Sequence, residues 1–495
     1  MLNRMAAYSI KELHHLLVAK KITPSQIVKN AFTNLDKYQV LNATVTELKT
    51  EATALAAKLD HLVVPKNNYL FALPYFAKDN FATKGIKTTA SSKILENFIP
   101  NYESTVTNIL KENNSILLGK AALDELGMGG HGLYALTGDV LNPWDLSRIT
   151  GGSSSGSAAL VVAGVVPFAL GTDTGDSVRK PAGYCGVVGF KPTYGLISRY
   201  GVFPYAPSLD TVGYFTRTVE DSAIVFDYLA QEDHKDATSL KSKEQGYFKN
   251  LSSEKIKKQK FAYLKNAHMI LPNEIRIHFD HLYDELTARG ISVTAIDFPE
   301  DLLKALMPVY MVISFAEAVS SHSMLDGINY GTRVDGDTYQ EVMMNSRTNG
   351  FGHVVKRRYV IGSYTLTKNN QTLLFLKAKQ VRRLIVNALT TVFSKYDFLL
   401  LPAASAIAPK ITTIKDQILT EAELENYVDD LLVLGNLMGN PSLTVPLAFV
   451  DKMPIGINVN AAPFADQKVF NASLLIEEIV GIKNKVVPER GKNHD

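Results

Sequence analysis

Glycine and small hydroxyl residues are concentrated in residues 141–216, and this stretch constrains the fold more than any other feature of the chain. It contains GGSSSGS from Gly151 and GTDTGDS from Gly171, with an apolar run at residues 158–171 between them. A membrane-spanning helix needs about 20 residues, so this run of 14, which includes Pro167, predicts a buried core element. Glycine at this density indicates backbone brought close to a ligand. A flexible linker is the alternative, but a linker does not enclose a core run.

The rest of the chain alternates between helix and strand patterns. Ser9 with Glu12 and Thr23 with Gln26 form capping boxes, which predict helices at residues 11–20 and 24–38. From residue 69 onward, short apolar runs that end in Gly, Pro or Asp are followed by helical patterns, as in α/β proteins. Further strands are expected at residues 261–263, 292–296 and 397–401, and amphipathic helices at residues 273–289 and 377–396.

Composition excludes several classes of protein. A net charge of +3 gives no electrostatic footprint for nucleic acid. The single cysteine, Cys185, excludes an intramolecular disulfide and a cysteine-cluster metal site. Metal-ligand spacings such as H-E-x-x-H are absent, so we expect no metal site. The N-terminus has the layout of neither a signal peptide nor a transit peptide, and we expect a cytoplasmic protein without a membrane partner, an organelle matrix being the open alternative.

The choice of nucleophile is narrow. Cys185 lies in an apolar, glycine-rich setting typical of a core residue. Residues 151–216 contain no histidine, and G-x-S-x-G matches only at residues 152–156, without the strand-to-helix context of a nucleophile elbow. Serines and lysines remain. Lys78 is the strongest candidate base because it ends a predicted buried strand, where desolvation favours the neutral amine; the alternative is an ordinary exposed lysine at a strand end.

Three motifs carry a resemblance to a known family. FAKDN around Lys78, GGSSSGSAALVVAG from Gly151 and GTDTGDSVRKPAGYCGVVGFKPTYGLIS from Gly171 agree in order and spacing with the amidase signature family. The resemblance implies a Ser-Ser-Lys triad in which Ser177 is the nucleophile and Ser153, on a cis peptide, relays its proton to Lys78. It also implies an oxyanion hole formed by the backbone of Thr174, Gly175, Asp176 and Ser177.

The same resemblance implies the architecture. We expect one α/β/α sandwich domain on a large mixed twisted sheet, with the active site at strand ends under glycine-rich loops. Residues 1–65 would form an N-terminal helical layer of this domain, residues 66–485 the amidase signature domain, and residues 486–495 a C-terminal tail.

Further segments, including SSHSMLDGINYG and NGFGHVVKRRYVIGSYTL, resemble the members of this family that hydrolyse glutamine for tRNA-dependent amidation. This implies a glutaminase that supplies ammonia for converting Glu-tRNA(Gln) to Gln-tRNA(Gln) through an acyl-enzyme intermediate. The implied partners are B and C subunits in a heterotrimer. The tRNA is expected to be held mainly by B, and ATP and Mg²⁺ also on B, with no cofactor in this chain. The alternatives are a stand-alone amidase of the same family and a catalytically degraded scaffold subunit.

Glutamine carries an α-carboxylate and an α-ammonium, so a selective pocket needs a forked cation and a carboxylate. By resemblance, Arg358 is the expected carboxylate clamp, Asp430 the ammonium acceptor and Tyr310 a third pocket residue. Arg357 and Asp429 remain open as the functional neighbours of Arg358 and Asp430, and either pair of neighbours could form surface ion pairs.

Two positions depart from the family pattern. Ser155 and Asp176 each stand where the family has glycine, and Asp176 directly precedes the expected nucleophile. A carboxylate beside a developing oxyanion would oppose its stabilisation, which is worth about 3 kcal/mol per donor in comparable enzymes. Our hypothesis is that the Asp176 side chain points away from the oxyanion and that activity survives.

Overall fold

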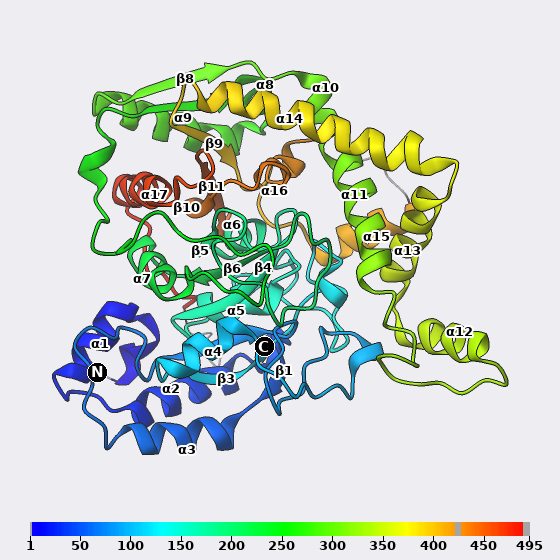
Figure 1. Cartoon of the computed structure of the whole chain (residues 1–495). Helices are drawn as coiled ribbons and strands as arrows, with labels where there is room; N and C mark the ends of the chain where they lie inside the picture. The colour runs from blue at the N-terminus through cyan, green and yellow to red at the C-terminus, as the bar shows by residue number, and fades with distance from the viewer. Residues whose placement is uncertain (1, 421–426, 489–495) are drawn as a thin grey trace.

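One mixed sheet runs through the molecule. The computed structural model describes residues 2–420 and 427–488. Within them, eleven strands follow the order β1-β3-β2-β4-β6-β5-β10-β11-β9-β7-β8 (Figure 1), which confirms the predicted α/β class with a single large sheet. The strands are β1 Thr44–Glu47, β2 Pro74–Lys78, β3 Ile116–Ala121, β4 Phe168–Asp173, β5 Val188–Lys191, β6 Thr211–Thr216, β7 Lys260–Leu264, β8 Ser292–Ile296, β9 Phe398–Pro402, β10 Ser442–Val450 and β11 Met453–Asn460.

Parallel and antiparallel pairs share the sheet. Strand β2 pairs in parallel with β3 and β4, and β7 pairs in parallel with β8 and β9. The remaining described pairs are antiparallel. Because β2 and β4 are parallel neighbours, their last residues, Lys78 and Asp173, lie at the same edge of the sheet. Ligand sites of α/β sheets form at the carboxyl ends of parallel strands.

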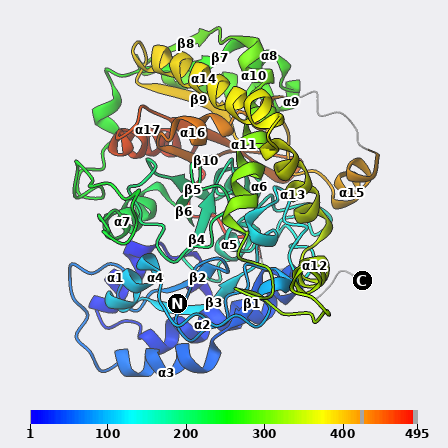
Figure 2. The same cartoon turned by 45° about the vertical axis from the view of Figure 1, so that its right-hand side comes forward.

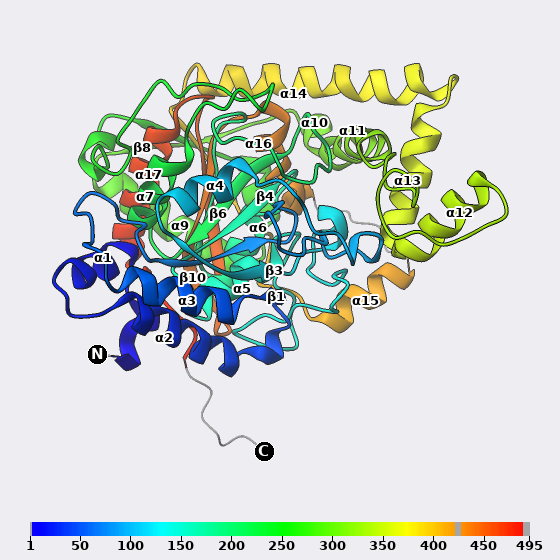
Figure 3. The same ribbon diagram turned by 60° about the horizontal axis from the view of Figure 1, so that its bottom comes forward.

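Several groups of helices pack on and around the sheet (Figures 2 and 3). Helices α5 and α6 contact each other and the central strands, while α4, α7, α17 and α9 form a second connected series. Figure 3 shows α12 and α13 at the end of the molecule away from α1. The helices are α1 Ile10–Val18, α2 Pro24–Lys37, α3 Lys49–Leu59, α4 Thr105–Glu112, α5 Ser155–Val162, α6 Arg179–Cys185, α7 Val219–Leu229, α8 Lys265–Ile270, α9 Asn273–Ala288, α10 Glu300–Lys304, α11 Leu306–Ser321, α12 Tyr339–Gly350, α13 His353–Leu366, α14 Lys377–Phe393, α15 Ile411–Thr420, α16 Val433–Met438 and α17 Asp466–Val480.

Local sequence signals place the first helices. In both α1 and α2 the side chain at the N-cap accepts from the third helical N–H, and the side chain of that third residue accepts from the N-cap N–H. Both predicted capping boxes are therefore confirmed. The predicted strands and helices between residues 261 and 401 are also confirmed as β7, β8, β9, α9 and α14, with ends shifted by up to three residues.

The apolar run at residues 158–171 was predicted to be a single core element, but in the structure it belongs to two elements. It contains most of α5 and the first part of β4, joined by a turn. Gly164 in that turn has φ +67°, a conformation that glycine adopts without strain, and Pro167 cannot continue a helix. The run is buried as expected, but it crosses from a helical layer into the sheet.

The N-terminal segment is expected to form a helical layer, and the C-terminal segment is expected to form a tail. Residues 1–65 hold α1, α2 and α3, and they also contribute β1, which pairs with β3 at the edge of the sheet. Of the expected tail, residues 489–495 lie outside the described residues. In the described chain, one helical stretch, Glu300–Ser321, passes a length and composition test for crossing a membrane. Core helices pass the same test, and Leu306, Val309 and Ile313 of this stretch are buried.

Candidate active site

Lys78 ends strand β2 with its side chain fully buried. Its ammonium nitrogen lies 2.9 Å from Ser153 Oγ, 2.9 Å from Ser154 Oγ and 2.8 Å from Thr172 Oγ1. Burial lowers the pKa of Lys78 from 10.5 to about 7, although the nearby carboxylates of Asp124, Asp173 and Asp210 raise it. A lysine with this pKa is partly neutral at physiological pH and can accept a proton from a hydroxyl group.

Ser153 is held by the loop that precedes α5. The Gly152–Ser153 peptide bond is cis, and the Ser153 side chain is 1% exposed. The carboxylate of Asp124 organises this region, accepting hydrogen bonds from the backbone N–H groups of His131, Gly132 and Tyr134. A Cβ at Gly152 would lie 2.0 Å from Asp124 Oδ2, so only glycine fits there. Sequence reasoning missed Asp124, and no local pattern marks it.

Ser177 lies in the loop between β4 and α6. Its carbonyl oxygen accepts from Ser154 N at 3.2 Å, which holds this loop against the GGSSSGS segment. Ser177 as a residue is 4% exposed, and its hydroxyl makes no hydrogen bond within residues 2–420 and 427–488, not even with Ser153. Likewise, in the described chain, no backbone N–H of residues 174–177 donates a hydrogen bond. The loop therefore presents a free hydroxyl and free N–H donors, as an oxyanion hole requires.

A buried ion pair fixes the two ends of this loop. Arg179 donates to both carboxylate oxygens of Asp173, at 3.0 and 2.9 Å, and both side chains are fully buried. Arg179 also donates to the carbonyl oxygens of Gly175 and Leu432 and to Asn436 Oδ1. One guanidinium group thus connects the loop to Leu432, just before α16, and to Asn436 within that helix. Bidentate arginine–carboxylate geometry is the strongest form of this contact.

Arg358 reaches the site from α13. Its Nη1 donates to Tyr205 Oη at 3.1 Å, and its guanidinium lies over the Phe315 ring, 5.0 Å from the centroid. The neighbouring Arg357 is exposed, so of the two alternatives Arg358 faces inward. Tyr205, which sequence reasoning missed, also donates to Ser314 Oγ at 3.0 Å.

His322 is a second residue that sequence reasoning missed. Its Nε2 lies 2.6 Å from the carbonyl oxygen of Pro204, and its Nδ1 lies 2.8 Å from Tyr359 Oη. Because the carbonyl can only accept, the ring carries its proton on Nε2. Burial lowers the pKa of His322 to about 4, so the ring is neutral. It ties the helix that carries Arg358 to the loop that carries Tyr205.

Asp429 and Asp430 have different surroundings. Asp429 accepts hydrogen bonds from the N–H and hydroxyl of Ser405, both at 2.8 Å. The Asp430 carboxylate has no hydrogen bond within the part of the chain that the structure describes. Burial raises its pKa to about 7, an effect that Lys180 opposes and that Asp429 and Asp176 reinforce. Of these two carboxylates, Asp429 is therefore the one held by hydrogen bonds, and Asp430 is the one without such a partner among the described residues.

Tyr310 lies against the nucleophile loop. A Cβ on Gly175 would lie 3.0 Å from Tyr310 Cε2, which places the ring in contact with the predicted oxyanion hole. Asp210 supports the same loop, because its carboxylate accepts from Thr174 Oγ1 at 2.6 Å and from Tyr205 N at 2.8 Å. Asp210 was also missed by sequence reasoning.

The two departures from the family pattern have different consequences. Asp176 adopts no positive φ, so the replacement of glycine brings no backbone strain. Its carboxylate forms an ion pair with Lys180, with Oδ2 and Nζ 2.7 Å apart. Ser155 begins α5 fully buried, and its hydroxyl has no hydrogen-bond partner among the described residues.

Cys185 and clustered His, Cys, Asp or Glu side chains are the other groups that could carry chemistry. Cys185 is buried, and burial raises the pKa of its thiol above the ordinary value. No group of three or more His, Cys, Asp and Glu side chains in residues 2–420 and 427–488 could hold a metal ion.

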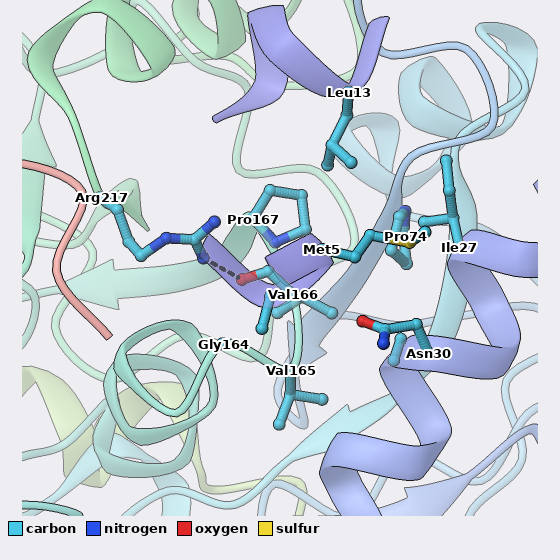
Figure 4. A pocket seen from close by; sticks show the side chains of 12 residues that line it. Met5, Leu13, Ile27, Asn30, Pro74, Gly164, Val165, Val166, Pro167 and Arg217 are labelled. Atoms are coloured by element: carbon cyan, nitrogen blue, oxygen red, sulfur yellow. Dashed lines mark hydrogen bonds between the residues drawn. The ribbon is translucent and has the colours of Figure 1, made fainter. Parts of the chain in front are cut away.

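A cavity of about 20 Å³ between the N-terminal helices and the turn before β4 (Figure 4) has room for about one water molecule, and Lys78 is not among the residues that line it. It is lined by Met5, Ala6, Leu13, Ile27, Asn30, Ala31, Pro74, Gly164, Val165, Val166, Pro167 and Arg217.

The structure thus combines one large mixed sheet with a buried contact between Lys78 and Ser153 at the end of strand β2. The family model for Amidase matches residues 26–470, and the chain belongs to the amidase family. The A subunit of the glutamyl-tRNA(Gln) amidotransferase of Mycoplasma pneumoniae is 42% identical over 426 residues, which cover 85% of this chain and 87% of that protein. The corresponding protein of Pediococcus pentosaceus is 37% identical over 484 residues, covering 96% and 97%. The crystal structure of its counterpart from Thermotoga maritima superimposes with a TM-score of 0.77 at 33% identity, covering 96% of this chain and 95% of that one.

Proposed function

We propose that this chain is the glutaminase subunit of a glutamyl-tRNA(Gln) amidotransferase. The observation that carries the proposal is the buried Lys78, whose pKa is about 7 and whose ammonium nitrogen contacts Ser153. Arg358 and the free carboxylate of Asp430 support glutamine as the substrate, because one is a forked cation and the other an anion. The relatives named above support the amidotransferase role.

The proposed reaction is acyl transfer through Ser177. The Ser177 hydroxyl attacks the side-chain amide carbon of glutamine, its proton passes to Ser153, and Ser153 gives its own proton to neutral Lys78. The backbone N–H groups of residues 174–177 stabilise the oxyanion. Collapse of the tetrahedral intermediate breaks the carbon–nitrogen bond, and the proton returned by Lys78 leaves with ammonia. Water then hydrolyses the glutamyl ester by the same proton path.

The proposal extends to partners. A B subunit would bind Glu-tRNA(Gln), ATP and Mg²⁺ and use the ammonia, and a C subunit would complete a heterotrimer in the cytoplasm. Tyr310 would line the glutamine pocket beside the oxyanion loop. In the domain description that we propose, residues 1–65 form an N-terminal layer, residues 66–485 the catalytic domain and residues 486–495 a tail.

Glutamine hydrolysis tests this proposal directly. Ammonia release is measured for the chain alone and with the B and C subunits, for wild type and for Ser177→Ala. We expect the alanine variant to lose activity by a factor of at least about 10³, since the nucleophile is removed. Wild-type activity in that variant would refute the assignment. Hydrolysis of simple amides by the chain alone would instead favour a stand-alone amidase, and an inactive wild-type complex would favour a scaffold.

A further inference from the structure

Asp176 and Lys180 form an ion pair beside the proposed nucleophile. Oδ2 of Asp176 lies 2.7 Å from Nζ of Lys180, and the side chains are only 18% and 14% exposed. The backbone N–H of Lys180 also donates to the backbone carbonyl oxygen of Asp176 at 2.9 Å. An acidic residue four positions before a basic one is the favoured orientation for such a pair in a helical turn.

Lys180 also connects this pair to the proposed ammonium site. Its Nζ donates to the carbonyl oxygen of Asp429 at 2.8 Å, so the lysine bridges the nucleophile loop and the segment that carries Asp430. The carboxylates of Asp176 and Asp429 raise the pKa of Lys180 above its ordinary value, although burial opposes them. Lys180 is therefore a permanent cation between two loops of the site.

We propose that Asp176 and Lys180 act as one compensated pair that positions the nucleophile loop and adjusts the pocket for the α-ammonium of the substrate. This inference rests on the proposed function. Lys180 holds the Asp176 carboxylate away from the free N–H donors. Asp176 in turn neutralises a cation that would otherwise pair with Asp430 and compete with the substrate.

The two single substitutions should therefore fail in different ways. In Lys180→Gln, the amide can still donate to Asp429, but Asp176 is left as an unpaired anion one residue before Ser177. We expect kcat to fall about tenfold or more, because the anion opposes the developing oxyanion. In Asp176→Gly, Lys180 is left unpaired beside Asp430, and we expect the KM for glutamine to rise about tenfold with kcat changed less than about threefold.

A double-mutant cycle on the assembled complex tests the pair. In Asp176→Gly/Lys180→Gln both charges are gone, and we expect kcat and KM to return to within about threefold of wild type. Lys180→Arg keeps the charge and should stay close to wild type, and melting temperatures of all variants separate misfolding from a local effect. The matched control is Lys304→Gln, which breaks the Glu300–Lys304 pair of the same i,i+4 spacing on the surface and should change neither constant.

Single effects that multiply in the double variant, without rescue, would overturn the proposal. A gain of several hundred-fold in kcat for Asp176→Gly would also overturn it, because the natural residue would then be crippling the oxyanion hole. The KM effect is measured independently as the Kd of glutamine for each variant on a Ser177→Ala background by calorimetry. Activity that survives Ser177→Ala would refute the proposed function itself, and this outcome is distinct from a failed rescue.

Discussion

Protonation of Lys78 is expected to set the pH dependence of glutamine hydrolysis. The amine must be neutral to accept a proton from Ser153, and burial lowers its pKa from 10.5 to about 7. The perturbations are pH itself and Lys78→Arg, because arginine places a permanent cation at the same position.

The expected magnitude follows from the shift. A change of about 3.5 units corresponds to about 5 kcal/mol in favour of the neutral amine at 1.36 kcal/mol per unit. At pH 8, about nine-tenths of the molecules would hold a neutral Lys78, against about 0.3% for a lysine of ordinary pKa. Activity should therefore rise about tenfold per pH unit below 7 and level off above it. For Lys78→Arg we expect kcat to fall by about 10² to 10⁴, the usual contribution of general-base catalysis.

The assay is ammonia release at saturating glutamine from pH 5.5 to 9. Asp430 also has a pKa of about 7, but a bound ammonium keeps its carboxylate ionised, so kcat reports Lys78 while kcat/KM reports both groups. Lys191 provides the matched control. It is fully buried, and burial lowers its pKa to about 7, yet it donates to the carbonyl oxygens of Pro192 and Asn440. Lys191→Met should keep the inflection in kcat. A flat profile in wild type, or an inflection near 7 that persists in Lys78→Arg, would refute the reasoning.

Three further predictions concern the surroundings of the site. Tyr205→Phe removes one hydrogen bond to Arg358 and should raise the KM for glutamine several-fold, consistent with about 1 kcal/mol, with kcat nearly unchanged in steady-state assays. Arg358→Lys loses the forked geometry and should raise KM by about tenfold or more; an unchanged KM would remove Arg358 from the pocket. Asp173→Asn leaves Arg179 without its buried anion and should lower the free energy of unfolding by about 3 to 5 kcal/mol at pH 7. Since Arg179 holds the pKa of Asp173 at about 2 despite burial, denaturant titrations should show this loss shrinking as pH falls from 4 toward 2.

Much of the fold could be predicted from local pattern. The starts of α1 and α2 were predictable because a capping box satisfies N–H groups within four residues of sequence. The strand that ends at Lys78 was also predictable, because an apolar run bounded by a charged residue has few alternatives. The division of residues 158–171 into a helix and a strand was not, since a continuous apolar run suits either element when both faces are buried.

The residues of the candidate site also fall into those that the sequence predicted and those that only the structure revealed. The candidates Lys78, Ser153 and Ser177 were found from motifs, whereas the supports at Asp124, Asp210, Tyr205 and His322 were not. A hydrogen bond from Arg358 to Tyr205 joins residues 153 positions apart, and the contact of His322 with Pro204 spans 118 positions. No local periodicity records a contact of that kind.

The sequence by itself determined which groups this protein has for chemistry: serines in glycine-rich loops, a lysine at the end of an apolar run, one cysteine, and no metal-binding pattern. Only the tertiary structure decided their electrostatic state. Ser405 donates hydrogen bonds to Asp429, whereas Asp430 has no hydrogen-bond partner among the described residues. Burial gives Lys78 a pKa of about 7. Lys180 lies between the carboxylate of Asp176 and the backbone carbonyl of Asp429. The physical reason is that desolvation and charge interactions are sums over all neighbours in space, and most of those neighbours are distant in sequence.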